Sequence, residues 1–193
     1  VQPGWRRTRT AVLSPVLWRR RAVFLLGSVA VGAAAVGFAK ASDEAQLLFR
    51  AAAARWPLLP LLLTPLGFAL VAWMTRRWFD GAQGSGIPQA IAARRSQDEA
   101  HRSALMSVRV TVGKIVLTVL GLLVGASTGR EGPTVQVGAA IMFGIGRFAG
   151  IGRQPGLILA GAAAGVAGAF NTPLAGIVFA IEEMAKAFDR RMN

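Results

Sequence analysis

The chain has 193 residues, a mean hydropathy of +0.48 and 53% hydrophobic residues, values that fit a membrane protein better than a soluble one. Lysine and arginine outnumber aspartate and glutamate by 22 to 9, and the basic residues cluster between apolar runs, as in membrane proteins with basic cytoplasmic segments. Nucleic-acid binding is not expected, because the aromatic residues lie in the apolar runs and not among the arginines. The chain has no cysteine, which excludes disulfides and thiolate metal sites.

The N-terminal segment is basic and is followed by a first apolar run. Residues 1–21 carry arginines and no acid, so we expect a cytoplasmic N-terminus there. Residues 22–39 are uninterrupted and apolar, near the length that spans a bilayer. A signal peptide is the alternative, because Ala39-Lys40-Ala41 resembles a small-x-small cleavage site. The run is longer than a usual signal-peptide core and further apolar segments follow, so we predict a transmembrane helix.

The remaining apolar runs predict an all-α, polytopic membrane protein in which residues 22–193 form one membrane domain. Charges of both signs over residues 40–55 predict an external connection, and residues 56–74 a second span. Residues 76–114 are more basic than acidic, which assigns them to the cytoplasmic side. A third apolar run covers residues 110–127, and helical segments follow at 135–146 and 155–169, the last rich in glycine and alanine as in closely packed helices.

A Gly-Arg-Glu-Gly-Pro-Thr-Val-Gln-Val-Gly motif at residues 129–138 carries an acid within apolar sequence. Pro133 is typical of the first position of a helix, where the N–H groups of the first turn have no intrahelical partner. These donors and the positive end of the helix dipole form an anion site, which Glu131 can occupy, or leave when it is protonated. The alternative is that Glu131 is an ordinary first-turn acid that complements the dipole of its own helix.

Two further motifs contain helix starts. Gly84-Ser85-Gly86-Ile87-Pro88 describes a nest of backbone N–H groups with a hydroxyl donor, or alternatively a plain Gly-Ser turn. The segment Gly168-Ala-Phe-Asn-Thr-Pro-Leu-Ala-Gly leads to two adjacent acids, Glu182 and Glu183. Asn171 can cap a helix with Pro173 in its first turn. Adjacent residues lie ~100° apart around a helix, so one acid can face the bundle interior while the other meets water. The alternative is a solvated acidic helix end.

These three motifs, in this order and spacing, closely resemble the CLC family of chloride channels and proton-coupled chloride antiporters. The resemblance covers the chain from about Val23 onward. It implies a helical fold of inverted repeats with broken and tilted helices, usually a homodimer with one anion pathway per subunit, in a cell membrane that we expect to be a bacterial inner membrane. The expected partners are chloride, protons and the lipid bilayer, with no cofactor, no metal and no enzymatic activity.

The resemblance also implies roles for individual residues. Two selectivity-filter segments are expected, with Ser85 donating its hydroxyl to the central chloride; their residues are Gly84, Ser85, Gly86, Ile87 and Pro88, and Gly129, Arg130, Glu131, Gly132 and Pro133. Glu131 matches the gating glutamate that takes protons from the outside. Glu183 matches the internal proton-transfer glutamate of the antiporters, and Glu182 is expected to line the water route to it.

One departure from the family pattern bears on function. The sequence ends at Asn193, shortly after the two acids, and has no tyrosine, whereas the family has a second inverted repeat with a third filter segment and an inner tyrosine. We therefore expect the first inverted repeat, the N-terminal half of a proton-coupled chloride antiporter. A passive voltage-gated-type chloride channel and a non-transporting truncated remnant are the alternatives.

Overall fold

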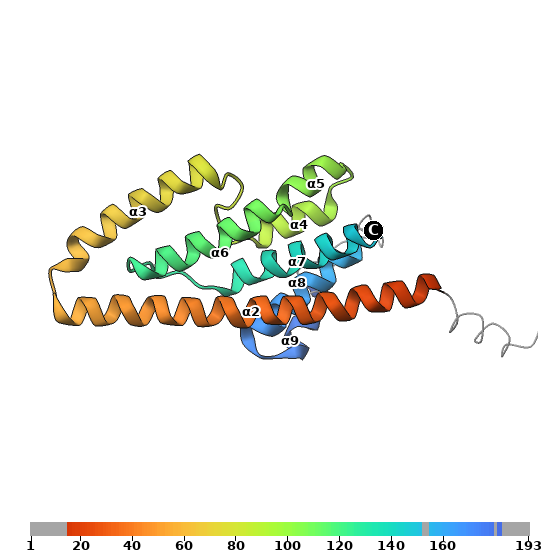
Figure 1. Cartoon of the computed structure of the whole chain (residues 1–193), viewed down its shortest axis with the longest axis horizontal. Coiled ribbons are helices and arrows are strands. Elements are labelled where there is room, and N and C mark those ends of the chain that lie inside the picture. Colours follow the sequence, from red (N-terminus) through yellow and green to blue (C-terminus); the bar gives the residue numbers. More distant parts are fainter. Residues whose placement is uncertain (1–14, 152–154, 180, 183–193) are drawn as a thin grey trace, which may run out of the picture.

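The computed structural model describes residues 15–151, 155–179 and 181–182, and in these ranges the chain is helical with no strand (Figure 1). The all-α prediction is therefore confirmed. The helices follow one another in the order α2 (Pro15–Arg55), α3 (Leu59–Trp78), α4 (Ile87–Arg95), α5 (Glu99–Leu105), α6 (Val108–Leu123), α7 (Glu131–Phe148), α8 (Pro155–Phe170) and α9 (Pro173–Phe179).

Helix α2 is continuous over 41 residues, so residues 40–55, predicted as an external connection, are the second half of a helix. Between Lys40 and Arg55 there is neither glycine nor proline, and alanine, leucine and glutamine favour a helix; the first breaker is Pro57. At 1.5 Å per residue the helix is about 60 Å long, twice the ~30 Å hydrocarbon core of a bilayer. It runs along the whole length of the molecule (Figure 1). The charged residues of its second half therefore lie on a helix that leaves the apolar layer.

Three helical stretches among the described residues are long and apolar enough to cross a membrane: Leu17–Arg55, Leu59–Trp78 and Glu99–Leu123. Each predicted span falls on one of them, which confirms the polytopic prediction. Most of the large side chains of α3 are exposed, Leu62 to 70%, and Pro65 lies inside this helix without ending it. The third span ends at Leu123, not Ser127, because Gly125 adopts a left-handed conformation (φ +92°) just after the helix.

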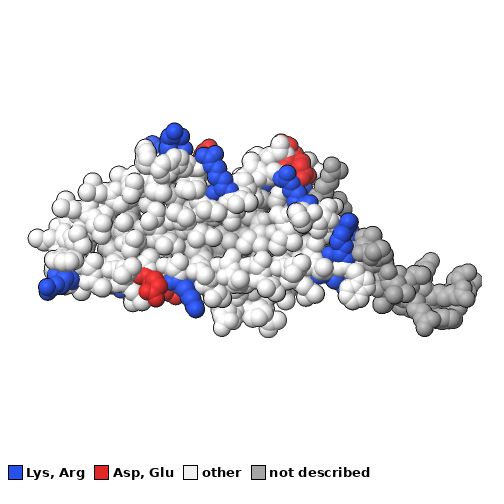
Figure 2. Space-filling view, in the orientation of Figure 1, with Lys and Arg blue, Asp and Glu red and all other residues white. Residues whose placement is uncertain are grey.

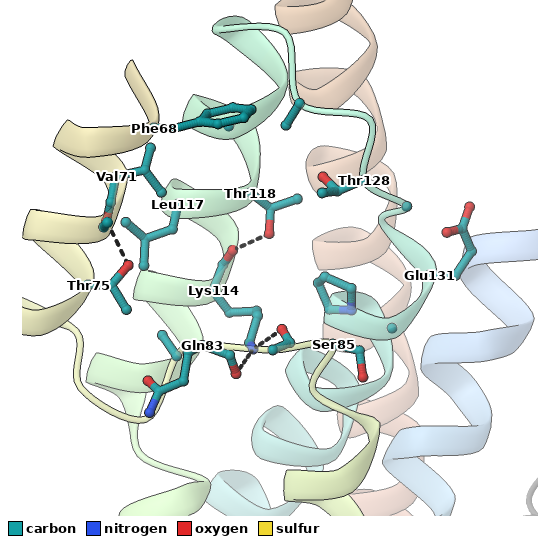
Figure 3. A pocket seen from close by; sticks show the side chains of 18 of the residues that line it. Phe68, Val71, Thr75, Gln83, Ser85, Lys114, Leu117, Thr118, Thr128 and Glu131 are labelled. Atoms are coloured by element: carbon teal, nitrogen blue, oxygen red, sulfur yellow. Dashed lines mark hydrogen bonds between the residues drawn. The ribbon is translucent and has the colours of Figure 1, made fainter. Parts of the chain in front are cut away.

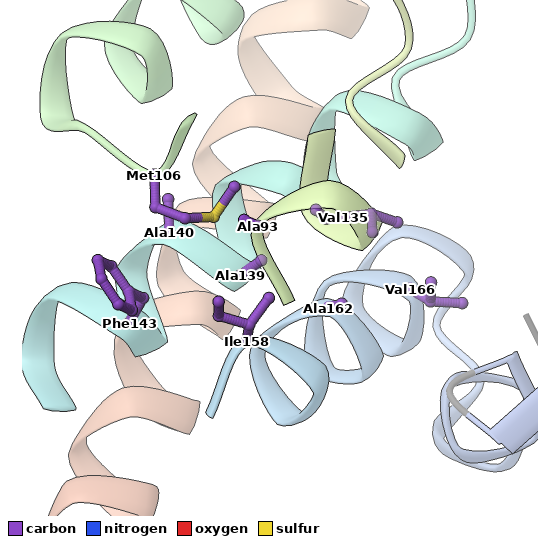
Figure 4. Close-up of a cluster of buried hydrophobic side chains, with 10 residues drawn as sticks. Ala93, Met106, Val135, Ala139, Ala140, Phe143, Ile158, Ala162 and Val166 are labelled. Atoms are coloured by element: carbon purple, nitrogen blue, oxygen red, sulfur yellow. The ribbon is translucent and has the colours of Figure 1, made fainter. Parts of the chain in front are cut away.

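The closest helix packing is between α7 and α8 and depends on glycine. A Cβ built on Gly138 would collide with the Gly161 carbonyl, and one on Gly165 would meet the Thr134 carbonyl oxygen at 2.5 Å. Small residues therefore allow the two backbones to touch, which confirms the predicted close packing of residues 155–169. Beside this contact, side chains from α4, α7 and α8 form the main apolar cluster, with Phe143 and Ile158 among its fully buried members (Figure 4).

Asn171 ends α8 and does not cap α9, which corrects the predicted capping role. It has φ +54°, and the Thr172 N–H donates to the Ala167 carbonyl at 3.1 Å, the pattern of a helix that closes through a left-handed residue. Pro173 is the first residue of α9, as predicted.

Charged side chains on the face shown in Figure 2 lie at its edges, and uncharged residues cover the middle. Basic residues occupy the last turns of α3, α4 and α7, where they complement the negative end of each helix dipole; they are Arg76, Arg77, Arg94, Arg95 and Arg147. This distribution fits a protein whose apolar middle lies in a bilayer.

Candidate anion site

The first predicted filter segment is the loop between α3 and α4. Gly86 precedes α4 with φ +97°, a conformation that glycine adopts without strain. Ser85 is exposed, and its backbone N–H, like that of Gly84, donates to no described residue. A hydrogen bond connects the loop to α4, because Gln89 Nε2 donates to the Gln83 carbonyl at 2.6 Å. The segment thus offers a hydroxyl and unpaired amides at the start of a helix, the arrangement predicted for an anion nest.

The second predicted filter segment begins α7. The helix starts at Glu131, so Pro133 is its third residue and not its first, which corrects the predicted register. Pro133 still lies in the first turn, where its missing N–H leaves no bond unmade. The Thr134 N–H already donates to the Arg130 carbonyl at 3.0 Å, whereas the N–H groups of Glu131 and Gly132 have no partner among the described residues. The free donors of this helix start therefore belong to Glu131 and Gly132 themselves.

The two segments touch through their backbones, although 46 positions separate Gly86 from Gly132. A Cβ on Gly132 would lie 2.7 Å from the Ser85 carbonyl oxygen, and one on Gly86 would lie 2.8 Å from Gln136 Cβ and 3.1 Å from the Gly132 carbonyl oxygen. A side chain at either position would push the segments apart. The glycines of the two motifs are therefore required for the approach of one helix start to the other.

A cavity of about 740 Å³ opens beside this contact, between α3, α6 and the two segments (Figure 3). Apolar residues of α3 and α6, such as Phe68 and Leu117, form one wall. The predicted filter residues on the other wall are Gly84, Ser85, Ile87, Gly129, Glu131, Gly132 and Pro133, while Gly86, Pro88 and Arg130 do not line it. An apolar pocket with a few convergent polar groups is a typical binding site. The selectivity-filter roles of these residues stay predictions.

Glu131 stands at the edge of the cavity with its side chain half-buried. Its carboxylate lies against Gly129, so closely that a Cβ there would collide with Glu131 Oε2, and in Figure 3 it points away from Ser85. Ser85 and the carboxylate of Glu131 are therefore on different sides of the α7 start. The acid does not occupy the space beside Ser85 in this conformation.

Arg130 does not line the cavity, and its charged end contacts α2. Its Nη1 donates to the Ala39 carbonyl at 3.0 Å and to Asp43 Oδ1 at 2.5 Å. The unbroken α2 thus carries Asp43 alongside the start of α7.

Lys114 is the residue that the sequence analysis missed, since it was assigned to the basic cytoplasmic loop. It lies in α6, only 2% exposed, and its Nζ donates to the carbonyls of Gln83 at 3.1 Å and Gly84 at 2.9 Å (Figure 3). A lone lysine between apolar residues of a predicted span was the available clue, because charges inside a membrane are costly and usually functional.

The two acids of the third motif are only partly described. Glu182 is exposed, and Glu183 lies outside the described residues. The large apolar residues of α9 and just beyond it are also exposed, Leu174 to 77% and Ile181 to 65%. The roles of both acids in proton transfer stay predictions.

The chain matches a known protein family. A family model described as voltage gated chloride channel covers residues 66–193, from α3 to the end of the chain and including all three motifs. The chain belongs to the CLC family. CLC proteins are membrane-embedded chloride channels or transporters and not enzymes, so the match supports a chloride channel or transport function for this chain.

CLC membership agrees with the geometry of the cavity. Two glycine-containing helix starts from distant parts of the sequence meet at one place, and the positive ends of their dipoles favour an anion there. Among the described residues no group of three or more histidine or acidic side chains could hold a metal ion. The polar groups at the cavity are backbone amides, hydroxyls, the Gln83 side-chain amide, one lysine and one acid.

Proposed function

We propose that this chain contributes the first two filter segments and the gate of a proton-coupled chloride antiporter. The observation that supports the proposal best is the backbone contact between Ser85 and Gly132 at the edge of a large cavity. A small anion bound beside this contact would have the Ser85 hydroxyl and the unpaired amides of both helix starts as its nearest donors. Chloride is monoatomic and accepts hydrogen bonds from every side, so donors that converge from two directions suit it.

Glu131 is the proposed gate because its carboxylate is tethered at this anion site. In the charged form it competes with chloride for the same amides, and protonation removes that competition. The position of the carboxylate beside Gly129, away from Ser85, is consistent with an anion site that Glu131 leaves open. Glu131 therefore either occupies the anion site in its charged form or carries a proton and leaves the site to chloride. This alternation would couple proton transport to chloride transport.

Glu131→Gln in the protein expressed from its complete gene tests the gate. The amide imitates the protonated acid, so we expect chloride flux to persist while chloride-driven proton uptake into liposomes falls to background. Glu44→Gln is a matched control, because Glu44 is an exposed acid of α2 away from the cavity, and it should transport protons like the parent. Proton uptake at the parent rate in Glu131→Gln would exclude Glu131 as the gate.

The two acids near the C-terminus distinguish the antiporter from a passive channel. Glu183 is the proposed internal proton-transfer residue and Glu182 lines the water route to it. We expect Glu183→Gln to stop proton movement and leave chloride flux, and Glu182→Gln to slow protons only. If neither variant changes proton flux, the passive channel is the better assignment.

A further inference from the structure

Lys114 places a positive charge inside the described part of the protein, where it forms no ion pair. Its side chain is 2% exposed, and among the described residues neither of the two ion pairs includes it. Burying an ammonium group is costly unless hydrogen bonds or an opposite charge compensate. Both hydrogen bonds that it makes go to neutral carbonyls, so its charge is solvated but not neutralised. An anion in the adjoining cavity would complete the balance of charge.

The two carbonyls that Lys114 holds are those just before Ser85. In a planar trans peptide the carbonyl and the N–H point in opposite directions. Because the Gln83 and Gly84 carbonyls face the ammonium, the N–H groups of Gly84 and Ser85 face away from it. These are the N–H groups that donate to no described residue. Lys114 therefore fixes the direction of two free donors without standing between them and a ligand.

The loop has few other supports. Gln83, Gly84 and Ser85 are exposed, and Gly84 has φ +75°, so apolar packing does not fix this stretch. Gln89 also donates to the Gln83 carbonyl, but the Gly84 carbonyl has Lys114 as its one donor among the described residues. Among the described residues, the lysine is thus the one hydrogen-bond donor that orients the peptide between Gly84 and Ser85.

We infer that Lys114 is a positioning residue of the chloride site: its ammonium orients the Gly84 and Ser85 amides towards the anion and supplies the positive charge that the anion balances. The inference rests on the proposed function and adds to it a residue from α6, outside the filter motifs. It acts in two ways, through hydrogen bonds to the loop and through charge. Replacement by an apolar side chain of similar length removes both.

Chloride affinity of the purified protein from the complete gene, titrated calorimetrically in detergent, tests this inference. We expect Lys114→Met to bind chloride at least about tenfold more weakly, because a charge close to the anion in a partly dry site is lost. Lys114→Arg, which keeps the charge and the donors, should recover most of the affinity. Thr111→Val is the matched control on the same helix: its hydroxyl bonds only the Ser107 carbonyl at 2.9 Å, and it does not line the cavity, so its affinity should equal that of the parent.

A second readout separates positioning from general stability. Chloride should raise the unfolding temperature of the parent and of Thr111→Val, and raise that of Lys114→Met much less at the same concentration, whatever the starting values. If Lys114→Met does not fold, Lys114→Gln is measured in the same way. Unfolding of both variants at every chloride concentration would assign Lys114 a structural role and overturn the inference.

The two proposals fail in different ways. A chloride response of Lys114→Met equal to that of the parent would overturn the inference alone. A parent protein that neither binds chloride nor gains stability from it would overturn the proposed function, and this inference with it.

Discussion

The starts of α4 and α7 meet at the same cavity but are held in place by different forces. Helix α7 has 18 residues, and from Pro133 to Ala140 every residue is buried against its neighbours. Helix α4 has nine residues, and residues 83–85 before it are exposed and held by the polar side chains of Lys114 and Gln89. One side of the site is thus fixed by close apolar packing and the other by hydrogen bonds to carbonyls.

Because of this difference, the two sides of the site should contribute differently to folding stability and to anion binding. Apolar packing around α7 and α8 contributes to the fold whether or not an anion is present. The polar contacts of the α4 loop contribute little net stability, because folding exchanges hydrogen bonds with water for internal ones, but they fix the direction of the donors. Changes on the α7 side should therefore affect folding and binding together, and changes on the α4 side should affect binding more than folding.

The largest effect is expected where the two sides touch. In Gly132→Ala the added Cβ would lie 2.7 Å from the Ser85 carbonyl oxygen, a backbone atom that cannot move without moving the loop. We expect a loss of about 1–3 kcal/mol in the free energy of unfolding, typical of overpacking, together with weaker chloride binding. Thermal unfolding and chloride titration in detergent measure the two quantities.

Gly144→Ala provides the control in the same helix. A Cβ on Gly144 would meet nothing within 4 Å, so this variant should keep the stability and the chloride affinity of the parent, or gain slightly in stability. Equal behaviour of the two alanine variants would show that the contact between the segments is not close enough to matter.

A smaller effect is expected from Gln89→Leu. The variant loses the 2.6 Å hydrogen bond to the Gln83 carbonyl, but Lys114 still holds that carbonyl, and a buried Oε1 that lacks a partner among the described residues is removed as well. These opposing terms should keep the net change in unfolding free energy within about 1 kcal/mol. Chloride affinity should fall less than in Lys114→Met. A loss as large as that of the lysine variant would mean that the loop depends on both ties equally, contrary to the assignment of the Gly84 carbonyl to Lys114.

The smallest effect is expected from Asp43→Asn, which weakens the contact between α2 and the start of α7. The Asp43 side chain is 60% exposed, and Arg130 keeps its 3.0 Å hydrogen bond to the Ala39 carbonyl. An exposed ion pair contributes at most about 1 kcal/mol and less at high ionic strength. Unfolding temperatures at low and high potassium gluconate should therefore differ from those of the parent only at low salt. A large loss at both concentrations would mean that this ion pair, and not packing, holds the α7 start.

Sequence patterns predicted the helical membrane fold and the two helix starts because both depend on local chemistry. Apolar runs of bilayer length identify spans, and glycine next to proline marks where a helix begins after a tight turn. The register of α7 was predicted two residues late, because Glu131 and Gly132 can also take helical angles and only the hydrogen bond from Thr134 to Arg130 decides the boundary.

Features that depend on contacts between distant residues were not predictable in this way. Charge pattern alone suggested an external connection in the second half of α2, and whether a mixed-charge stretch is a loop or a protruding helix depends on its partners, here Arg130. Lys114 was assigned to the cytoplasmic side by the same reasoning from charge. Lys114 is buried because the loop that contains Gln83 and Gly84, 31 and 30 positions earlier in the chain, lies against α6 and offers it two carbonyls.

Bromide substitution followed by crystallography tests most directly the claim that the two helix starts share one anion site, since bromide resembles chloride and its anomalous scattering identifies it. In the protein from the complete gene, we predict a bromide peak in the cavity within hydrogen-bonding distance of the Ser85 N–H or hydroxyl and beside the start of α7, and a weaker peak there in Lys114→Met. Bromide found only away from this cavity, with Ser85 and Gly132 in contact but no anion beside them, would contradict the account.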